Sequence, residues 1–342
     1  MKLLRLFAVC SALSLLAGCE QNKAADTGTG SKSGSAASSS GSKKLTIAVM
    51  PKLVGIDYFN AVKKGAEEAA KELDVELVYD GPTTNDVTKQ AEMLDTWIAR
   101  KVDVIAVAPN DPHALAPTLR KAQQRGIKVL TFDSDSDADS RSYFVNQATG
   151  ESIAQALVDV LASEIGGQGE VAIVSGSMTA DNQNTWIKQM KAHIAAKYPN
   201  LNVIAIKPSE EDQQLAVQVT QDLVKANPNL KGIFGITSVA LPGAALGLEQ
   251  AGVAGKVALT GLSTPKSMKK FVDNGTVKTF VLWSPVDLGY LTVQAAKVIA
   301  GGEKVPSPFK AGRLNDVQSS GTEIILGPPT KFTKENISQF DF

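Results

Sequence analysis

The chain has almost no cysteine. Only Cys10 and Cys19 occur among its 342 residues, and both lie near the N-terminus. The chain after Cys19 can form no internal disulfide and no cysteine metal site, so burial of apolar side chains must stabilise it. Roughly 300 residues follow the N-terminal segment, which is enough for two domains of ordinary size.

Histidine and the common catalytic motifs are equally scarce. His113 and His193 are the two histidines that could serve a Ser-His-Asp triad. His113 lies at a predicted helix start and His193 among lysines on a solvated helix, and neither position favours catalysis. The sequence has no G-x-S-x-G elbow, no P-loop and no G-x-G-x-x-G after a strand. These observations argue against an enzyme, although a hydrolase on a doubly wound fold stays an alternative.

The charge is balanced, with 35 basic and 35 acidic residues, and no basic run occurs in the folded part. This distribution differs from that of a nucleic-acid binder. The acidic stretch from Asp133 to Asp139 resembles a calcium loop, but Ala138 replaces the turn glycine and Phe144 the twelfth-position glutamate. We therefore expect no nucleic-acid partner, no metal and no cofactor.

The N-terminus reads as an export signal. Residues 1–18 contain Lys2 and Arg5 and then an apolar core that is too short to span a membrane. Residues 16–19, LAGC, resemble a bacterial lipobox, in which the peptide is cut before the cysteine and lipid is attached, here to Cys19. Residues 19–43 have the Gly, Ser and Ala composition of a flexible linker. An exported, lipid-anchored protein is predicted, with an ordinary cleaved signal as the alternative.

From Lys44 onward, short apolar runs alternate with segments of helical period. This pattern indicates parallel sheets with right-handed crossovers, and two doubly wound sheets in two lobes are more natural than one wide sheet. Strands are expected at residues 45–50, 75–79, 102–108, 127–132, 170–176, 201–206, 231–237, 256–262 and 276–283. Helices are expected near 58–73, 87–100, 112–125, 151–165, 183–198, 211–226, 241–251 and 265–274.

Polar or aromatic residues follow the predicted strands, where open parallel sheets bind ligands. Asp133, which ends the apolar run IKVLTF, is the first candidate, although an acidic solvated loop is the alternative for the later aspartates. Opposed lobes with such strand ends would enclose a small polar molecule. The candidate ligand-binding residues are Lys52, Tyr58, Phe59, Asp133, Asn182, Gln183, Ser238, Ser263 and Trp283.

Several of these candidates also have structural interpretations. Tyr58 and Phe59 are consecutive on a predicted helix, so at most one is expected to face the core while the other faces a cleft. Trp283 follows a strand and is predicted as a cleft wall, whereas Trp186 is predicted to pack within the fold. One residue of 181–184, DNQN, is expected to cap the following helix.

Seven segments spread between Lys44 and Phe342 together form a specific pattern. The segments are PKLVG (51–55), YDGPT (79–83), QRGIKVLTFDSD (124–135), VNQAT (145–149), GLSTP (261–265), GTVKTFVLW (275–283) and the ending KENISQFDF. This pattern resembles one family, the periplasmic-type solute-binding proteins of sugar ABC transporters, in the branch that contains the autoinducer-2 receptor and the rhamnose-binding proteins.

The resemblance implies a type I periplasmic binding protein fold, with two lobes joined by three connecting strands. It puts residues 44–147 and 284–310 in the first lobe and 148–283 and 311–342 in the second. It also implies ligand capture by hinge closure, without any reaction. In the autoinducer-2 receptor, the ligand-binding positions correspond to Lys52, Asp133, Asn182, Gln183, Ile236 and Ser238, and three of the six match.

The departures concern Asn182, which replaces an aspartate, and Ile236 and Ser238, which replace a proline and an alanine. They put autoinducer-2 in doubt, and TSVALPGAA (237–245) and LWSPVDLGY (282–290) look closer to rhamnose-binding members. The working hypothesis is a monomeric, membrane-tethered receptor for a deoxysugar such as rhamnose, with an ABC permease as partner. Alternatives are an autoinducer-2 receptor and a sugar-sensing lipoprotein that signals to a membrane kinase or chemoreceptor.

Overall fold

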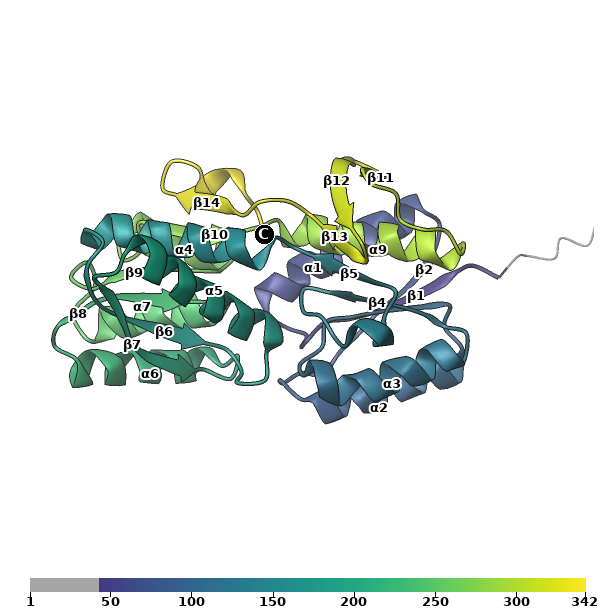
Figure 1. Ribbon diagram of the computed structural model, residues 1–342, viewed down its shortest axis with the longest axis horizontal. Helices are drawn as coiled ribbons and strands as arrows, with labels where there is room; N and C mark the ends of the chain where they lie inside the picture. Colours follow the sequence, from purple (N-terminus) through teal and green to yellow (C-terminus); the bar gives the residue numbers. More distant parts are fainter. Residues whose placement is uncertain (1–42) are drawn as a thin grey trace, which may run out of the picture. The chain divides into compact units, whose positions relative to one another are not determined.

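The computed structural model describes residues 43–342 (Figure 1). The predicted signal peptide, the predicted lipidation site Cys19 and the predicted linker up to residue 42 lie outside the described residues. The described part opens with β1 (Thr46–Met50), α1 (Asp57–Glu72), β2 (Glu76–Tyr79), α2 (Val87–Arg100), β3 (Val104–Val107), α3 (Pro112–Gln124), β4 (Lys128–Phe132), η1 (Ala138–Ser140) and β5 (Tyr143–Asn146).

The central strands β1, β3 and β4 of this first lobe are apolar on both faces because helices cover both faces. Ala48 and Met50 of β1 pack with α2 and α3 in one core cluster. Ile47 and Val49 pack on the opposite face with α1 and with α9 (Pro285–Ala300) in a second cluster. The uninterrupted hydrophobic runs in the sequence are thus explained by a sheet that is buried between two layers of helices.

The second lobe repeats the alternation of strand and helix. Its elements are α4 (Gly150–Ile165), β6 (Gly169–Ser175), α5 (Asp181–Lys197), β7 (Leu201–Pro208), α6 (Gln213–Ala226), β8 (Leu230–Gly235), α7 (Ala240–Gln250), β9 (Ala258–Gly261), α8 (Pro265–Asp273) and β10 (Thr279–Leu282). Four strands form a parallel sheet in the order β7-β6-β8-β9. A bridge between Leu262 and Val281 adds β10 to its edge. The predicted α/β class with two mainly parallel sheets is confirmed.

The last strands of the chain are divided between the two lobes. After α9 follow β11 (Phe309–Ala311), β12 (Leu314–Ser320), β13 (Glu323–Ile325), β14 (Thr330–Thr333) and η2 (Ile337–Gln339). The first sheet has the order β11-β12-β13-β5-β4-β3-β1-β2, in which β13 is parallel to β5. β14 pairs antiparallel with β10. The chain therefore passes between the two sheets three times, after β5, β10 and β13.

One part of the expected lobe division is wrong. Residues 311–325 were assigned to the second lobe, but β12 pairs with β13, and β13 with β5 of the first lobe. β12 is largely exposed, whereas β13 buries Ile324 in the core. The apolar run of β13 is only three residues long, so the sequence pattern does not decide which sheet it joins, and backbone pairing at the sheet edge does.

α1 and α9 pack unusually closely through two glycines. A Cβ atom at Gly65 would lie 1.7 Å from the carbonyl oxygen of Val286, and one at Gly289 would lie 1.9 Å from that of Val62. Each glycine thus receives the backbone of the opposite helix, where any side chain would collide. Because α1 begins beside the cavity described below, this contact gives the site a rigid support.

Neither a membrane-spanning helix nor a metal-binding cluster occurs within residues 43–342. Within residues 43–342, none of the helices combines the length and the apolar composition that a membrane crossing requires. The same residues contain no group of three or more His, Cys, Asp or Glu side chains arranged to hold a metal ion.

Candidate functional site

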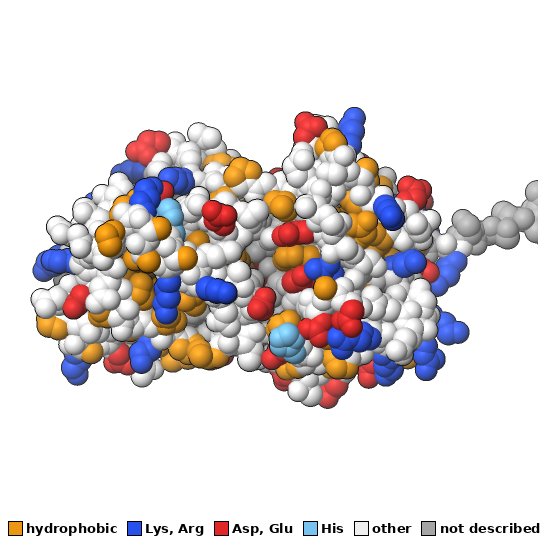
Figure 2. All heavy atoms as spheres, in the orientation of Figure 1, with side chains coloured by type: hydrophobic (Ala, Val, Ile, Leu, Met, Phe, Trp, Pro, Cys, Tyr) orange, Lys and Arg blue, Asp and Glu red, His pale blue; other side chains and the backbone are white. Residues whose placement is uncertain are grey.

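A cavity of about 430 Å³, including the part open to solvent, lies where the carboxyl ends of the two sheets face each other. The surface is hollowed between the lobes in Figure 2. The lining residues come from both lobes and are Lys52, Leu53, Ile56, Tyr58, Phe59, Asp133, Asn182, Gln183, Trp186, Glu211, Ile236, Thr237, Ser238, Leu262, Leu282 and Trp283.

Asp133 lies directly after β4 and is only 5% exposed. Its backbone adopts a left-handed conformation with φ +62°, and its N–H donates to the carbonyl oxygen of Val145 at 3.2 Å. This conformation turns the chain sharply at the end of the strand. Burial raises the pKa of the Asp133 carboxyl, while the Lys52 ammonium and the Tyr58 hydroxyl act against that rise. Asp133 is therefore a fixed, largely desolvated acceptor in the cavity.

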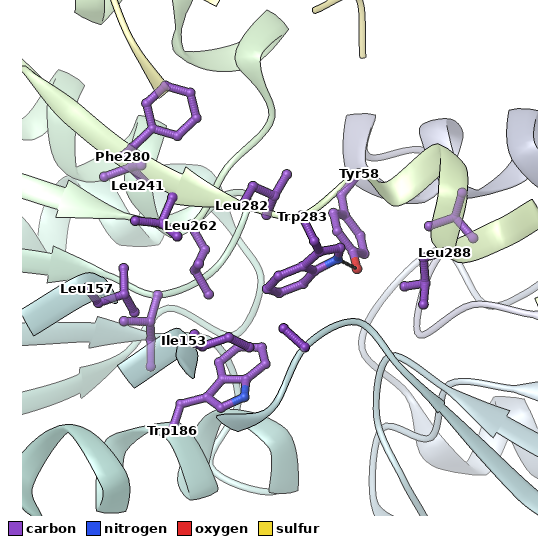
Figure 3. Packing of buried hydrophobic residues seen from close by; sticks show 14 of the residues in the cluster. Tyr58, Ile153, Leu157, Trp186, Leu241, Leu262, Phe280, Leu282, Trp283 and Leu288 are labelled. Carbon is purple, nitrogen blue, oxygen red and sulfur yellow. Dashed lines mark hydrogen bonds between the residues drawn. The ribbon is translucent and has the colours of Figure 1, made fainter. Parts of the chain in front are cut away.

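A chain of hydrogen bonds orients this carboxylate. The Trp283 Nε1–H donates to the Tyr58 hydroxyl at 2.8 Å, and that hydroxyl donates to Asp133 Oδ1 at 2.6 Å. Figure 3 shows the first of these bonds, with the Trp283 indole between Tyr58 and Trp186. Burial, followed by the proximity of Asp133, raises the pKa of Tyr58 well above its ordinary value, so its hydroxyl keeps its proton.

Lys52 and Asn182 connect the two lobes. The Lys52 ammonium donates to Asn182 Oδ1 at 2.9 Å, and Asn182 Nδ2 donates to the backbone oxygen of Asp133 at 3.2 Å. The expectation that one residue of 181–184 caps α5 is wrong. The N-cap is Ala180, with no capping side chain, because α5 begins earlier than predicted. The Asn182 amide is thereby available to the cavity.

Gln183 positions a carboxylate that the sequence analysis did not identify. Its Nε2 donates to Glu211 Oε1 at 2.7 Å, and its Oε1 accepts from the backbone N–H of Gly176 at 3.0 Å. Glu211 had been interpreted as the first residue of a helix, but α6 begins at Gln213. The signal that could have revealed it is its place just after β7, the same strand-end position as the other candidates.

Aromatic and aliphatic side chains form the rest of the wall. The rings of Trp186 and Trp283 lie 5.9 Å apart at an interplanar angle of 61°. Trp186, expected only to pack within the fold, lines the cavity as well. Tyr58 and Phe59 both line it, with ring centroids 5.0 Å apart, although one of the two was expected to face the core.

Two serines at strand ends behave differently. Ser238 lines the cavity, whereas Ser263 is fully buried behind the lining residues. The Ser263 hydroxyl donates to the backbone oxygen of Ser238 at 2.8 Å, so it supports the wall and does not reach the interior. Ser263 is therefore corrected from a candidate ligand-binding residue to a supporting one.

The arrangement can bind and orient a small molecule with hydroxyl groups. Carboxylate, amide and ammonium groups of the lining accept and donate hydrogen bonds, and its tryptophan rings offer apolar faces. The cavity lining contains no histidine among the described residues, and His113 and His193 bond to Asp137 and Asp159 on the surface.

Comparison with known proteins agrees with this geometry. The D-allose-binding periplasmic protein of Escherichia coli (strain K12) is 28% identical over 254 residues, covering 71% of this chain and 80% of that protein. A solute binding protein of an ABC transporter from Clostridium phytofermentas, with bound L-rhamnose, is 34% identical with a TM-score of 0.81 and covers 86% of this chain and 98% of its own. LsrB from Clostridium saccharobutylicum in complex with AI-2 is 25% identical with a TM-score of 0.82, covering 87% and 100%.

The family assignment has the widest support. The family model described as "Periplasmic binding protein domain" matches residues 47–304, which include all four strands of the second sheet, the parallel strands β1 to β5 of the first sheet except Thr46, and every lining residue of the cavity. The chain therefore belongs to the periplasmic binding protein family and is a binding protein, not an enzyme.

Proposed function

We propose that this protein is the extracytoplasmic sugar-binding component of an ABC importer, and that its ligand is a deoxysugar resembling rhamnose. The main observation behind the proposal is one group of polar side chains in the cavity between the lobes. The Asp133 carboxylate is held by the Tyr58 hydroxyl, and Lys52 of the first lobe is hydrogen-bonded to Asn182 of the second, which also bonds to the Asp133 backbone. Relatives named for binding D-allose and ribose, and a structure with bound L-rhamnose, support the ligand class.

The composition of the cavity favours a deoxysugar over a fully hydroxylated hexose. Leu53, Ile56, Ile236, Leu262 and Leu282 offer no hydrogen bond to a hydroxyl. A methyl group in place of a hydroxyl fits such a wall, whereas a buried hydroxyl without a partner costs about 1 to 3 kcal/mol. The remaining hydroxyls of the sugar are then available to the polar groups around Asp133.

Autoinducer-2 is the second candidate ligand. The AI-2 complex of LsrB has a TM-score of 0.82 to this chain. Lys52, Asp133 and Gln183 are the three residues that match the ligand-binding positions implied by the resemblance to the autoinducer-2 receptor. Against it, Asn182 supplies a neutral amide where that family has a carboxylate, and this exchange removes a charge-assisted acceptor.

Isothermal titration calorimetry of the purified protein tests the ligand. L-mannose is the matched control for L-rhamnose, since the two differ only in the C6 hydroxyl. We expect L-rhamnose to bind at least 10-fold more tightly, in line with about 1.4 kcal/mol or more for a buried, unpartnered hydroxyl. Equal affinities would remove the deoxysugar proposal. Absence of binding to these sugars, D-allose, ribose and AI-2 would remove the sugar-receptor function.

Membrane anchoring through Cys19 is supported by the lipobox-like residues 16–19 alone. Lipid on this cysteine would tether the sugar receptor at the membrane that holds its permease. Expression of the wild type and of Cys19→Ser in a bacterial host, followed by fractionation, tests the anchor. The wild type should sediment with membranes and label with radioactive palmitate. Equal labelling of the serine variant would exclude Cys19 as the anchor.

A further inference from the structure

Glu211 places a second carboxylate in the cavity, on the lobe opposite Asp133. We propose that Glu211 binds the ligand directly and determines specificity, accepting a hydrogen bond from a hydroxyl at the edge of the sugar opposite the one bound by Asp133. This assignment rests on the proposed function and deepens it. It predicts a neutral ligand with hydroxyl donors at two opposite edges.

The backbone around Glu211 is held in an unfavourable conformation. Glu210 and Glu211 both have left-handed backbone angles, with φ +50° and +57°. Two consecutive non-glycine residues in this region are costly, and such outliers concentrate at functional sites. The N–H groups of Ser209 and Glu210 donate to the carbonyl oxygens of Ser175 and Gly176 at 2.8 and 3.0 Å. The end of β6 thus fixes the turn that directs Glu211 to the cavity.

The carboxylate itself is also fixed. Gln183 Nε2 donates to Glu211 Oε1, and the orientation of this amide is unambiguous because its oxygen accepts from the backbone N–H of Gly176. A Cβ atom at position 176 would lie 2.2 Å from Glu211 Oε1 and 2.7 Å from Gln183 Oε1. Glycine at this position makes room for the carboxylate. The hydrogen bonds from Gln183 and Thr237 occupy two of its roughly four acceptor positions, which leaves acceptor capacity for a ligand.

The charges of the cavity limit the kind of ligand. Burial raises the pKa of Glu211, and Asp133 adds to that rise, while Lys52 and hydrogen bonds from Gln183 and Thr237 act against it. Lys52 is also the charge that opposes the rise at Asp133. The Lys52 ammonium is therefore shared between the carboxylates of Asp133 and Glu211, and the cavity has more hydrogen-bond acceptors than donors among its charged groups. Neutral polyhydroxylated sugars satisfy such a site, whereas sugar acids add a third negative charge.

The test compares Glu211→Gln with Glu210→Gln in the purified protein. Glu210 is exposed and shares the backbone conformation, so it controls for the turn. Calorimetry with L-rhamnose and AI-2 measures affinity, and thermal unfolding measures stability. We expect Glu211→Gln to bind at least 10-fold more weakly and Glu210→Gln to stay within twofold of the wild type. L-rhamnonate, the corresponding sugar acid, should bind the wild type at least 10-fold more weakly than L-rhamnose.

The outcomes separate the two proposals. If the wild type binds and Glu211→Gln binds equally well with a lowered melting temperature, Glu211 is only a structural partner of Gln183, and its assignment is overturned. Equal binding of L-rhamnonate overturns it as well. If the wild type binds neither probe and also fails to bind L-mannose, D-allose and ribose, the sugar-receptor function and the Glu211 role are both overturned. Should Glu211→Gln not fold, Glu211→Asp withdraws the carboxylate by one methylene, and unchanged affinity in that variant overturns the assignment.

Discussion

The Lys52 ammonium of the first lobe donates a hydrogen bond to Asn182 Oδ1 of the second lobe at 2.9 Å. Lys52 is 4% exposed, and its partner is a neutral amide and not a carboxylate. The backbone oxygen of Lys52 accepts from Asn110 Nδ2 at 2.9 Å, which holds the loop after β1 in place. A lysine so placed can donate to a ligand hydroxyl while it joins the two lobes.

We predict that Lys52→Ala weakens sugar binding about 10-fold, because one hydrogen bond to a charged group, about 1.5 kcal/mol, is lost. The effect should be smaller than that of removing Asp133, since a neutral sugar does not require a counter-ion. Calorimetry measures it, with Lys64→Ala on the exposed side of α1 as the control. A negligible change would mean that Lys52 has no ligand contact.

Asp133→Ala should abolish measurable binding while the fold stays intact. At least two charge-assisted hydrogen bonds of about 1.5 to 3 kcal/mol each would be lost, which corresponds to more than about 100-fold in affinity. The protein should still fold, with a lower melting temperature, because the buried Tyr58 hydroxyl loses its acceptor at a cost of about 1 to 3 kcal/mol, and removal of a carboxylate whose charged form burial disfavours offsets part of that cost. Asp137→Ala is the control, since Asp137 is bonded to His113 and Arg120 outside the cavity. Wild-type affinity in Asp133→Ala would show that the binding site is elsewhere.

Tyr58→Phe tests the hydrogen-bond chain that orients Asp133. The change removes the donor to Asp133 Oδ1 and leaves the Trp283 N–H without its acceptor. An unpartnered buried donor costs about 1 to 3 kcal/mol, so we expect about 10-fold weaker binding and a lower melting temperature. Tyr79→Phe is the control, because the Tyr79 hydroxyl donates only to the backbone oxygen of Phe59. If both variants bind equally well, the chain has no role in orientation.

Glu164→Gln should stabilise the protein at neutral pH. Burial raises the pKa of Glu164 to about 6, and its Oε1 is buried without a hydrogen-bond partner. The protonated form of an acid is favoured in the folded state when its pKa is raised there. The free energy of unfolding is therefore highest below the pKa of the unfolded state and falls as the pH rises through 6, where folded Glu164 loses its proton. The full shift corresponds to about 2 kcal/mol, and partial exposure reduces it to about 1 kcal/mol.

Urea unfolding of Glu164→Gln at pH 4 and pH 7.5 measures this effect. We expect equal stability at pH 4 and a gain of about 1 kcal/mol at pH 7.5. Glu303→Gln, at an exposed position, is the control and should change little at either pH. A gain of the same size at both pH values would exclude the titration of Glu164 as its cause.

Gly289→Ala should destabilise the first lobe. The added Cβ would lie 1.9 Å from the carbonyl oxygen of Val62, so α1 and α9 must separate. We expect a loss of about 3 kcal/mol, the upper range for overpacking a core. Gly301→Ala is the matched control, because its Cβ would meet the nearest atom at 3.4 Å. Similar stability of the two variants in urea unfolding would contradict the close packing of these helices.

The sequence was most informative where local pattern decides the structure. α2 occupies residues 87–100 as predicted, because its apolar period is clear and Asp86 caps its first turn. The position of Asp133 at the end of β4 was readable too, since an apolar run that stops at a carboxylate marks the end of a buried strand. These features depend on residues within one element, so no distant contact was needed to recognise them.

The sequence by itself thus determined two parallel sheets with polar residues beyond their strands. The tertiary structure alone decided that β12 and β13 join the first sheet, that Glu211 and Trp186 reach the cavity, and that Ser263 does not. Periodicity reports which face of an element is buried, but backbone pairing at a sheet edge and the conformation of a strand-end turn depend on residues far away in the chain. Which strand-end side chains converge on one ligand is therefore a property of the assembled lobes.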